Sequence, residues 1–105
     1  MDKKKSLVKN LKAFKQKACR NIRISNLILF GSYATGKTHR WSDVDLIVVS
    51  PDFRGMNFFQ RGAKMYGYWH LKKPVDFLCF TPEEFQRKRD GITIVNQALK
   101  EGVAI

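Results

Sequence analysis

The chain has 105 residues, with 20 Lys or Arg against 9 Asp or Glu, and its formal net charge is +11. This length predicts one domain over residues 1–105, with room for one modest core. A hydrophobic content of 44% excludes an intrinsically disordered chain. The basic charge favours a polyanionic partner, such as nucleic acid, a nucleotide or an acidic protein surface. Charge alone gives no specificity, so a merely solvated basic surface is an equal alternative.

Targeting and redox signals are weak in this sequence. The start, MDKKKSLVKN, is basic, but no apolar run follows it as in a signal peptide. No apolar run approaches the roughly 20 residues that span a bilayer. Cys19 and Cys79 stand in no metal-binding or redox spacing, which predicts free thiols. We therefore expect a cytoplasmic protein with no membrane association.

The first half of the chain predicts one helix and two buried strands. Ser6–Ile22 carries apolar residues three or four positions apart, with lysines on the opposite face, as in an amphipathic helix. Leu27–Phe30 and Val44–Val49 are short continuous apolar runs, which are typical of buried strands. A polar, glycine-containing segment connects the two strands.

The second half predicts helices around a third strand. Asn57–Trp69 is expected to be helical, with Phe59, Ala63 and Tyr66 on one face, although two glycines weaken the pattern. Val75–Phe80 is the strand.

Two further helices are expected after that strand. Thr81 is expected to cap the first, with Pro82 in the first turn and Glu84 completing a capping box; Gly91 would end it. Ile92–Lys100 is the last helix, with Ile92, Val95 and Leu99 facing inward and Gly102 closing it. The order predicts an α/β (α+β) fold, a small mixed β-sheet with helices packed on it.

The segment GSYATGKT, residues 31–38, matches the phosphate-binding loop G-x-x-x-x-G-K-[ST]. Such a loop opens a helix that crosses over to a parallel strand, which takes a dozen or more residues. Only four residues separate Thr38 from Asp43, and as a helix they would rise about 6 Å. The crossover cannot be built, so we do not expect a phosphate-binding loop of this type.

The same segment begins a second pattern that ends in paired carboxylates. Asp43 and Asp45 stand two positions apart at the start of a predicted strand, so their side chains point the same way. Asp76 holds the matching position in the strand Val75–Phe80. If these two strands are neighbours, the three carboxylates gather at one end of the sheet.

Such a cluster favours a bound cation. Two carboxylates about 4 Å apart repel by about 4 kcal/mol at an effective dielectric of 20. A cation, or raised pKa values, would relieve that repulsion. Mg²⁺ prefers oxygen ligands and binds through a few carboxylates plus substrate phosphates, and two ions can serve phosphoryl or nucleotidyl transfer. Asp43, Asp45 and Asp76 are therefore candidate metal ligands.

Other residues in the pattern suit phosphate groups. Gly31 permits a tight turn and a close approach of the backbone, and Ser32 offers a hydroxyl and an N–H. Lys37 or Arg40 could neutralise the outer phosphates. Tyr33 and Trp41 could stack on a base, but packing in or beside the core is the simpler interpretation. His39 and His70 are expected at the surface.

Taken together, GSYATGKTHRWSDVDLIVVS and the later PVDFLCFTPEEF resemble the DNA polymerase β-like nucleotidyltransferase superfamily. The short chain is similar to its minimal nucleotidyltransferases, including the MntA-like antitoxins. The resemblance implies the polymerase β-like fold and Mg²⁺-dependent transfer of a nucleoside monophosphate from an NTP. It also implies metal ligation by Asp43, Asp45 and Asp76, and binding of the triphosphate by Gly31 and Ser32.

The resemblance also implies a partner. Many minimal members are encoded beside a helical HEPN-type protein, and some transfer AMP from ATP to its tyrosine and so act as antitoxins. We therefore expect Mg²⁺ (two ions), ATP and a HEPN-type partner. Two alternatives stay open: a non-catalytic antitoxin that neutralises its partner by complex formation, and a basic nucleic-acid-binding domain.

Overall fold

The computed structural model describes residues 3–39, 42–91 and 93–105. The elements in chain order are α1 (Lys3–Ala18), β1 (Asn26–Phe30), α2 (Ser32–Thr35), β2 (Val44–Val49), the 3₁₀ helix η1 (Pro51–Phe53), α3 (Phe58–Tyr66), β3 (Val75–Phe80), α4 (Pro82–Arg89), α5 (Ile94–Glu101) and β4 (Val103–Ala104). None of the described helices is long and apolar enough to cross a membrane.

The four strands form one mixed sheet in the order β3-β2-β1-β4. β1 pairs antiparallel with β2 and with β4, whereas β2 and β3 run parallel. The predicted α/β architecture with a small mixed sheet is therefore confirmed. The antiparallel pairing of β1 with β2 also confirms that GSYATGKT does not lead into a parallel crossover.

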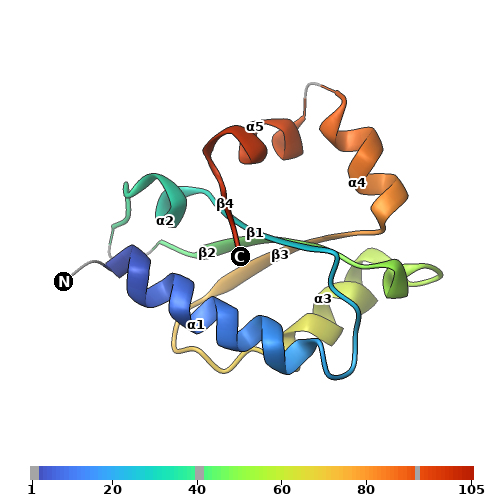
Figure 1. Ribbon diagram of the computed structural model, residues 1–105, viewed down its shortest axis with the longest axis horizontal. Coiled ribbons are helices and arrows are strands. Elements are labelled where there is room, and N and C mark those ends of the chain that lie inside the picture. Colours follow the sequence, from blue (N-terminus) through green and yellow to red (C-terminus); the bar gives the residue numbers. More distant parts are fainter. Residues whose placement is uncertain (1–2, 40–41, 92) are drawn as a thin grey trace.

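Helices cover the two faces of the sheet unequally (Figure 1). α1 and α3 lie on one face, where the larger core contains alternate strand residues, among them Leu29, Leu46 and Phe77. α4 and α5 lie on the other face, where a smaller core contains Ile47 and Val95. The period of two along each strand sends neighbouring residues into different cores.

α1 differs from the expected helix Ser6–Ile22 at both ends. Its predicted apolar face is correct, because Leu7, Leu11 and Phe14 are buried. The helix stops at Ala18, whose carbonyl accepts hydrogen bonds from the N–H groups of Asn21 and Ile22. Ile22 thus reaches the core through a turn and not through a continued helix.

The face predicted for α3 is wrong. Phe59 and Tyr66 are 80% and 51% exposed, and the buried residue is Met65. Asn57 and Gln60 form a reciprocal capping box, so the helix begins at Phe58 by local hydrogen bonding and leaves its first turn open to solvent.

The last two helices agree better with expectation. Thr81, Pro82 and Glu84 start α4 as predicted, with both hydrogen bonds of the capping box formed. α4 ends at Arg89 with Asp90 as its C-cap, just before the expected Gly91.

Thr93 caps α5, which begins later than expected and is closed by Gly102 as predicted. Val95 is buried, but Leu99 is 37% exposed because Ala98 takes the inward position. Ile92 lies outside the described residues.

Candidate active site

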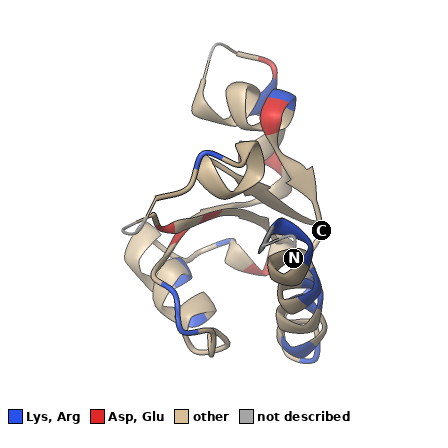
Figure 2. Cartoon of the chain, turned by 90° about the vertical axis from the view of Figure 1, so that its left-hand side faces the viewer, with Lys and Arg blue, Asp and Glu red and all other residues tan. Residues whose placement is uncertain are grey.

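The acidic residues Asp45 and Asp76 stand side by side at the start of two parallel strands. The register of β2 and β3 pairs Asp45 with Asp76, one residue after the pair formed by Val44 and Val75. Asp43 precedes β2 and is exposed. The predicted neighbourhood of the two strands is therefore correct. Figure 2 shows acidic segments on the sheet and a run of basic residues along α1.

The backbone of Gly31 closes against the Asp45 side chain. Gly31 follows β1, whose last residue, Phe30, pairs with Asp45 across the antiparallel ladder. A Cβ added at Gly31 would lie 2.2 Å from Asp45 Oδ2, far closer than a real contact, and Gly31 has a φ of +74°. Only glycine suits both the backbone angle and the space.

The electrostatics of the cluster centre on Asp45. Burial raises the pKa of the Asp45 carboxyl, and the charges of Asp76 and Asp43 raise that pKa further. Each of these causes disfavours the ionised form of Asp45. A cation placed among the three carboxylates would stabilise that ionised form.

Ser32 begins the short helix α2 directly after Gly31. Its carbonyl accepts hydrogen bonds from the N–H of Gly36, which has a left-handed conformation, and from the N–H of Lys37. The turn is therefore closed by its own backbone, and the Lys37 side chain is exposed. Arg40 and Trp41 lie outside the described residues.

Two lysines from other parts of the chain contact α2. Lys4 of α1 donates a hydrogen bond from Nζ to the Ala34 carbonyl at 2.9 Å. Lys73, in the segment before β3, places its ammonium 5.3 Å from the centre of the Tyr33 ring. Tyr33 also packs against the larger core, as the simpler interpretation of this residue predicts.

The sequence matches the nucleotidyltransferase domain family over residues 11–104. The chain belongs to this family. A search of curated proteins found no match.

Solved structures share the fold of this nucleotidyltransferase domain. A protein from Sulfolobus solfataricus assigned as a nucleotidyltransferase has a TM-score of 0.67 at 20% identity, over 96% of this chain and 80% of that one. A toxin–antitoxin structure with AMP-PNP has a TM-score of 0.57 at 24% identity, over 89% of this chain and 70% of that one. A mutant of the toxin–antitoxin MntA–HpeT has a TM-score of 0.51 at 22% identity, over 96% and 70%.

The carboxylates of the nucleotidyltransferase domain have the right donor chemistry for Mg²⁺, but they do not form a ready-made metal cage. Among residues 3–39, 42–91 and 93–105, no three His, Cys, Asp or Glu side chains are grouped closely enough to hold a metal by themselves. Mg²⁺ typically uses one or two carboxylates together with waters and substrate phosphates. The donor set therefore fits an ion that arrives with the nucleotide, and ligation by Asp43, Asp45 and Asp76 stays a prediction.

The remaining sequence expectations concern thiols and histidines. Cys19 and Cys79 are both free, the first exposed and the second buried. Burial raises the pKa of the Cys79 thiol to about 12, so it stays protonated at neutral pH. His39 and His70 are exposed, as predicted.

Reasoning from the sequence missed the supports around the site. Neither Lys4 nor Lys73 belongs to a motif, and each meets α2 only through the tertiary fold. One contact is with a backbone carbonyl and the other with an aromatic ring, so no charge pattern in the sequence pointed to either.

Proposed function

We propose that this domain is a Mg²⁺-dependent nucleotidyltransferase that transfers AMP from ATP to an acceptor hydroxyl. The acceptor is a tyrosine of a HEPN-type toxin partner, so the domain acts as an antitoxin. The observation that carries the proposal is the pairing of Asp45 with Asp76, with the Gly31 backbone closed against Asp45. Membership of the nucleotidyltransferase domain family supports the class of reaction.

The choice of nucleotide and partner has separate support. One structure with the same fold is a toxin–antitoxin with AMP-PNP, and another is a toxin–antitoxin pair. Their low sequence identity to this chain establishes the fold, so the nucleotide and partner are our proposals for this protein.

The residues divide the work of the transfer. Gly31 and Ser32 hold the triphosphate, because the glycine lets backbone N–H groups approach its oxygens and the serine adds a hydroxyl. Lys37 neutralises the outer phosphates. Mg²⁺, held by Asp43, Asp45 and Asp76 with the phosphates, would neutralise charge that develops on the transferred group.

The reaction itself is one displacement at the α-phosphorus. The acceptor hydroxyl oxygen forms a bond to this phosphorus, and the bond from it to the bridging oxygen of the β-phosphate breaks. Pyrophosphate leaves, and the hydroxyl proton passes to the Asp76 carboxylate. Asp76 is exposed on β3, so an acceptor from another molecule can reach it.

The test is transfer of label from ATP to protein. The domain is incubated with Mg²⁺, ATP labelled at the α-phosphate and the purified protein encoded beside it. We expect labelled tyrosine on that protein, and a loss of about a thousandfold or more in the D43N/D45N variant. D90N, on the C-cap of α4, removes a carboxylate outside the predicted site and should keep full activity.

The alternatives predict different outcomes. Full protection of cells by D43N/D45N, without labelling, would establish neutralisation by complex formation and overturn catalysis. Label that appears on RNA or DNA, with none on protein, would move the acceptor to nucleic acid. Failure of the unaltered chain both to label the neighbouring protein and to protect cells would refute the antitoxin proposal.

A further inference from the structure

A groove lies between the start of α3, the end of β3 and α4. Its volume is about 680 Å³. Residues from these three elements line it, including Phe58, Arg61, Phe80, Glu84, Arg87 and Lys88. Asp76 and Phe80 are four positions apart on β3, a rise of about 13 Å, so the groove opens well away from the acidic site.

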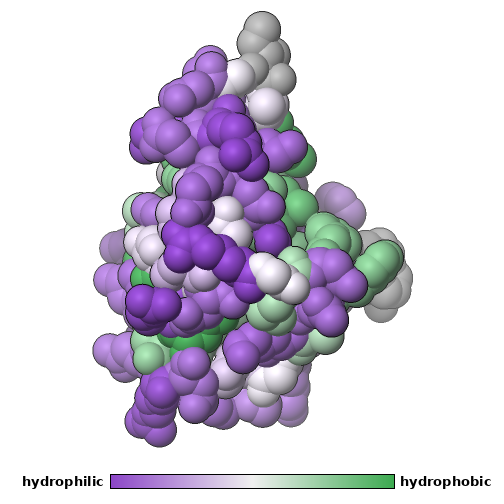
Figure 3. Space-filling view, turned by 90° about the vertical axis from the view of Figure 1, so that its right-hand side faces the viewer, coloured by the Kyte–Doolittle hydropathy of each residue, from purple (hydrophilic) through white to green (hydrophobic). Residues whose placement is uncertain are grey.

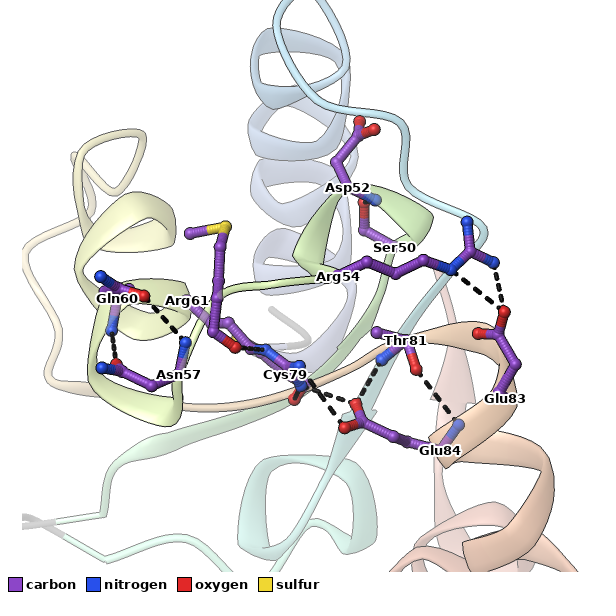
Figure 4. A network of polar contacts seen from close by, with 11 residues as sticks. Ser50, Asp52, Arg54, Asn57, Gln60, Arg61, Cys79, Thr81, Glu83 and Glu84 are labelled. Atoms are coloured by element: carbon purple, nitrogen blue, oxygen red, sulfur yellow. Dashed lines mark hydrogen bonds and ion pairs between the residues drawn. The ribbon is translucent and has the colours of Figure 1, made fainter.

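Arg61 lines this groove, and hydrogen bonds to several elements hold its side chain in place. Its side chain is only 12% exposed. Its Nη1 donates to Glu84 Oε1 at 2.6 Å and to the Cys79 carbonyl at 3.2 Å, while its Nε donates to the Met56 carbonyl at 2.9 Å (Figure 4). These bonds join α3, β3 and α4, so the groove is already formed in the free chain.

Two phenylalanines at the start of α3 face solvent beside the groove. Phe58 is 62% exposed and Phe59 is 80% exposed, and their rings meet edge to face with centroids 5.6 Å apart. Both rings leave apolar area in water, and contact with a partner would remove it. Figure 3 shows this side of the molecule as mostly hydrophilic, with apolar side chains between the polar ones.

The charges around the groove are unevenly paired. Glu83 pairs with Arg54, and Glu84 pairs with Arg61. Within the described part of the chain, the side chains of Arg87 and Lys88 have no ion pair or hydrogen bond. The groove therefore combines an apolar edge with two cations that lack a counter-charge.

We propose that this groove binds an acidic segment of a partner protein, with an aromatic or aliphatic side chain seated against Phe58 and Phe80. Carboxylates of that segment pair with Arg87 and Lys88. A nucleic acid fits less well, because the described residues of the groove offer a phosphate chain only two unpaired cations, Arg87 and Lys88, beside an apolar edge. The surface needs no transfer chemistry, so it stands apart from the proposed function.

The experiment uses two synthetic helical peptides of about fifteen residues, roughly four turns. Both carry the same Leu and Phe face, but one has Glu and the other Lys at its polar positions. Fluorescence anisotropy of each labelled peptide is measured with the full chain at about 0.15 M salt, where the Debye length is about 8 Å. We expect binding of the Glu peptide alone.

Matched variants locate the binding. R87E/K88E should weaken binding of the Glu peptide by about tenfold or more, and F58A should weaken it about fivefold. K9E/K12E, on exposed positions of α1, changes the net charge by the same amount and should alter binding less than about twofold. All these side chains are exposed, so the fold should persist, which circular dichroism checks.

Three outcomes would overturn the proposal. The first is no binding of the Glu peptide. The second is an equal loss in both double variants, which would show general electrostatic attraction. The third is displacement of the peptide by oligothymidylate whose own binding needs Arg87 and Lys88, which would assign the groove to nucleic acid.

Discussion

The two ends of one sheet face differ in how far their side chains are buried. At one end, Ile47 and Val49 are buried against Val95 and Ala98 of α5. At the other end of the same strand, Asp45 is only half-buried and stands beside the exposed Asp76. The side chains alternate in the same way along the whole strand, so the difference lies in what covers them.

This contrast separates stability from function along a single strand. The covered half, with Ile47 and Val49 beneath α5, buries apolar area, which stabilises the fold. The uncovered half, with Asp45 and Asp76, gathers like charges; burial first, and then the charges of Asp76 and Asp43, raise the pKa of the Asp45 carboxyl. Ionisable groups with shifted pKa values are frequent at functional sites, which is why the proposed chemistry is placed here.

The largest effect on activity is expected at Gly31, whose backbone lies against the Asp45 side chain. G31A should lower the rate of AMP transfer by about a thousandfold, or about 4 kcal/mol. The added methyl group would displace the Asp45 carboxylate, since the new Cβ would lie 2.2 Å from Oδ2. The rate is measured by release of labelled pyrophosphate.

Gly36 supplies a matched control for that substitution. It also has a positive φ, of +82°, but no atom lies within 4 Å of an added Cβ. G36A should therefore strain the backbone by about 1 kcal/mol without touching the carboxylates. An equal loss of activity in G36A and G31A would show that backbone strain, and not contact with Asp45, controls the rate.

The covered half is tested by removing buried volume. I47A should lower the free energy of unfolding by about 3 kcal/mol, because Ile47 is fully buried between α5 and the sheet. Urea denaturation measures the change. I94A removes the same atoms from a side chain that is 60% exposed, and it should cost less than about 1 kcal/mol. Equal losses would mean that this face has no protected core.

The sequence predicted the uncovered half better than its surroundings. The spacing of Asp43 and Asp45, and the matching place of Asp76, identified the acidic end because strand periodicity is local and simple. The parallel register that joins Asp45 to Asp76 needed the fold. The four-residue α2 was not foreseen, since its hydrogen bonds arise from the turn at Gly31.

The inward faces of the later helices were harder to predict. Helical spacing placed Phe59 on an apolar face with Ala63 and Tyr66, yet α3 begins at Phe58 after the capping box at Asn57, and Phe59 is exposed. The inward position predicted for Leu99 is also wrong, because its neighbour Ala98 packs in the smaller core and Leu99 is 37% exposed. Helical spacing alone gives two neighbouring faces similar apolar content, so packing decides between them.

A moderate effect is expected where Arg61 ties α4 to the sheet edge. E84Q should lower the free energy of unfolding at pH 7 by about 1–2 kcal/mol, through loss of a charged hydrogen bond. The hydrogen bond from Arg61 lowers the pKa of Glu84 below 4.5, so this stabilisation is complete above that pH and disappears as the pH falls through the lowered pKa. In thermal melts from pH 7 to pH 3, the melting temperatures of the unaltered chain and of E84Q should converge.

Glu83 provides a comparison that isolates the effect of burial, because it forms an ion pair that is more exposed than that of Glu84. Its pair with Arg54 is about half exposed on both sides, at 57% and 54%, whereas the Arg61 side chain is 12% exposed. E83Q should therefore destabilise the fold much less than E84Q does, because water screens an exposed ion pair. A cost equal to that of E84Q would mean that the Arg61 network contributes no more than a surface ion pair.

The smallest effect is expected at the border of the uncovered half, where Lys73 lies over the Tyr33 ring. K73M should lower the free energy of unfolding by about 0.5 kcal/mol, the value of an exposed cation–π contact. K72M changes the neighbouring exposed lysine and should be neutral. Because Tyr33 follows Ser32, a looser α2 should also raise the KM for ATP about twofold in K73M while kcat stays unchanged. If K72M raises KM equally, the lysines act through general attraction of the nucleotide and not through the position of Tyr33.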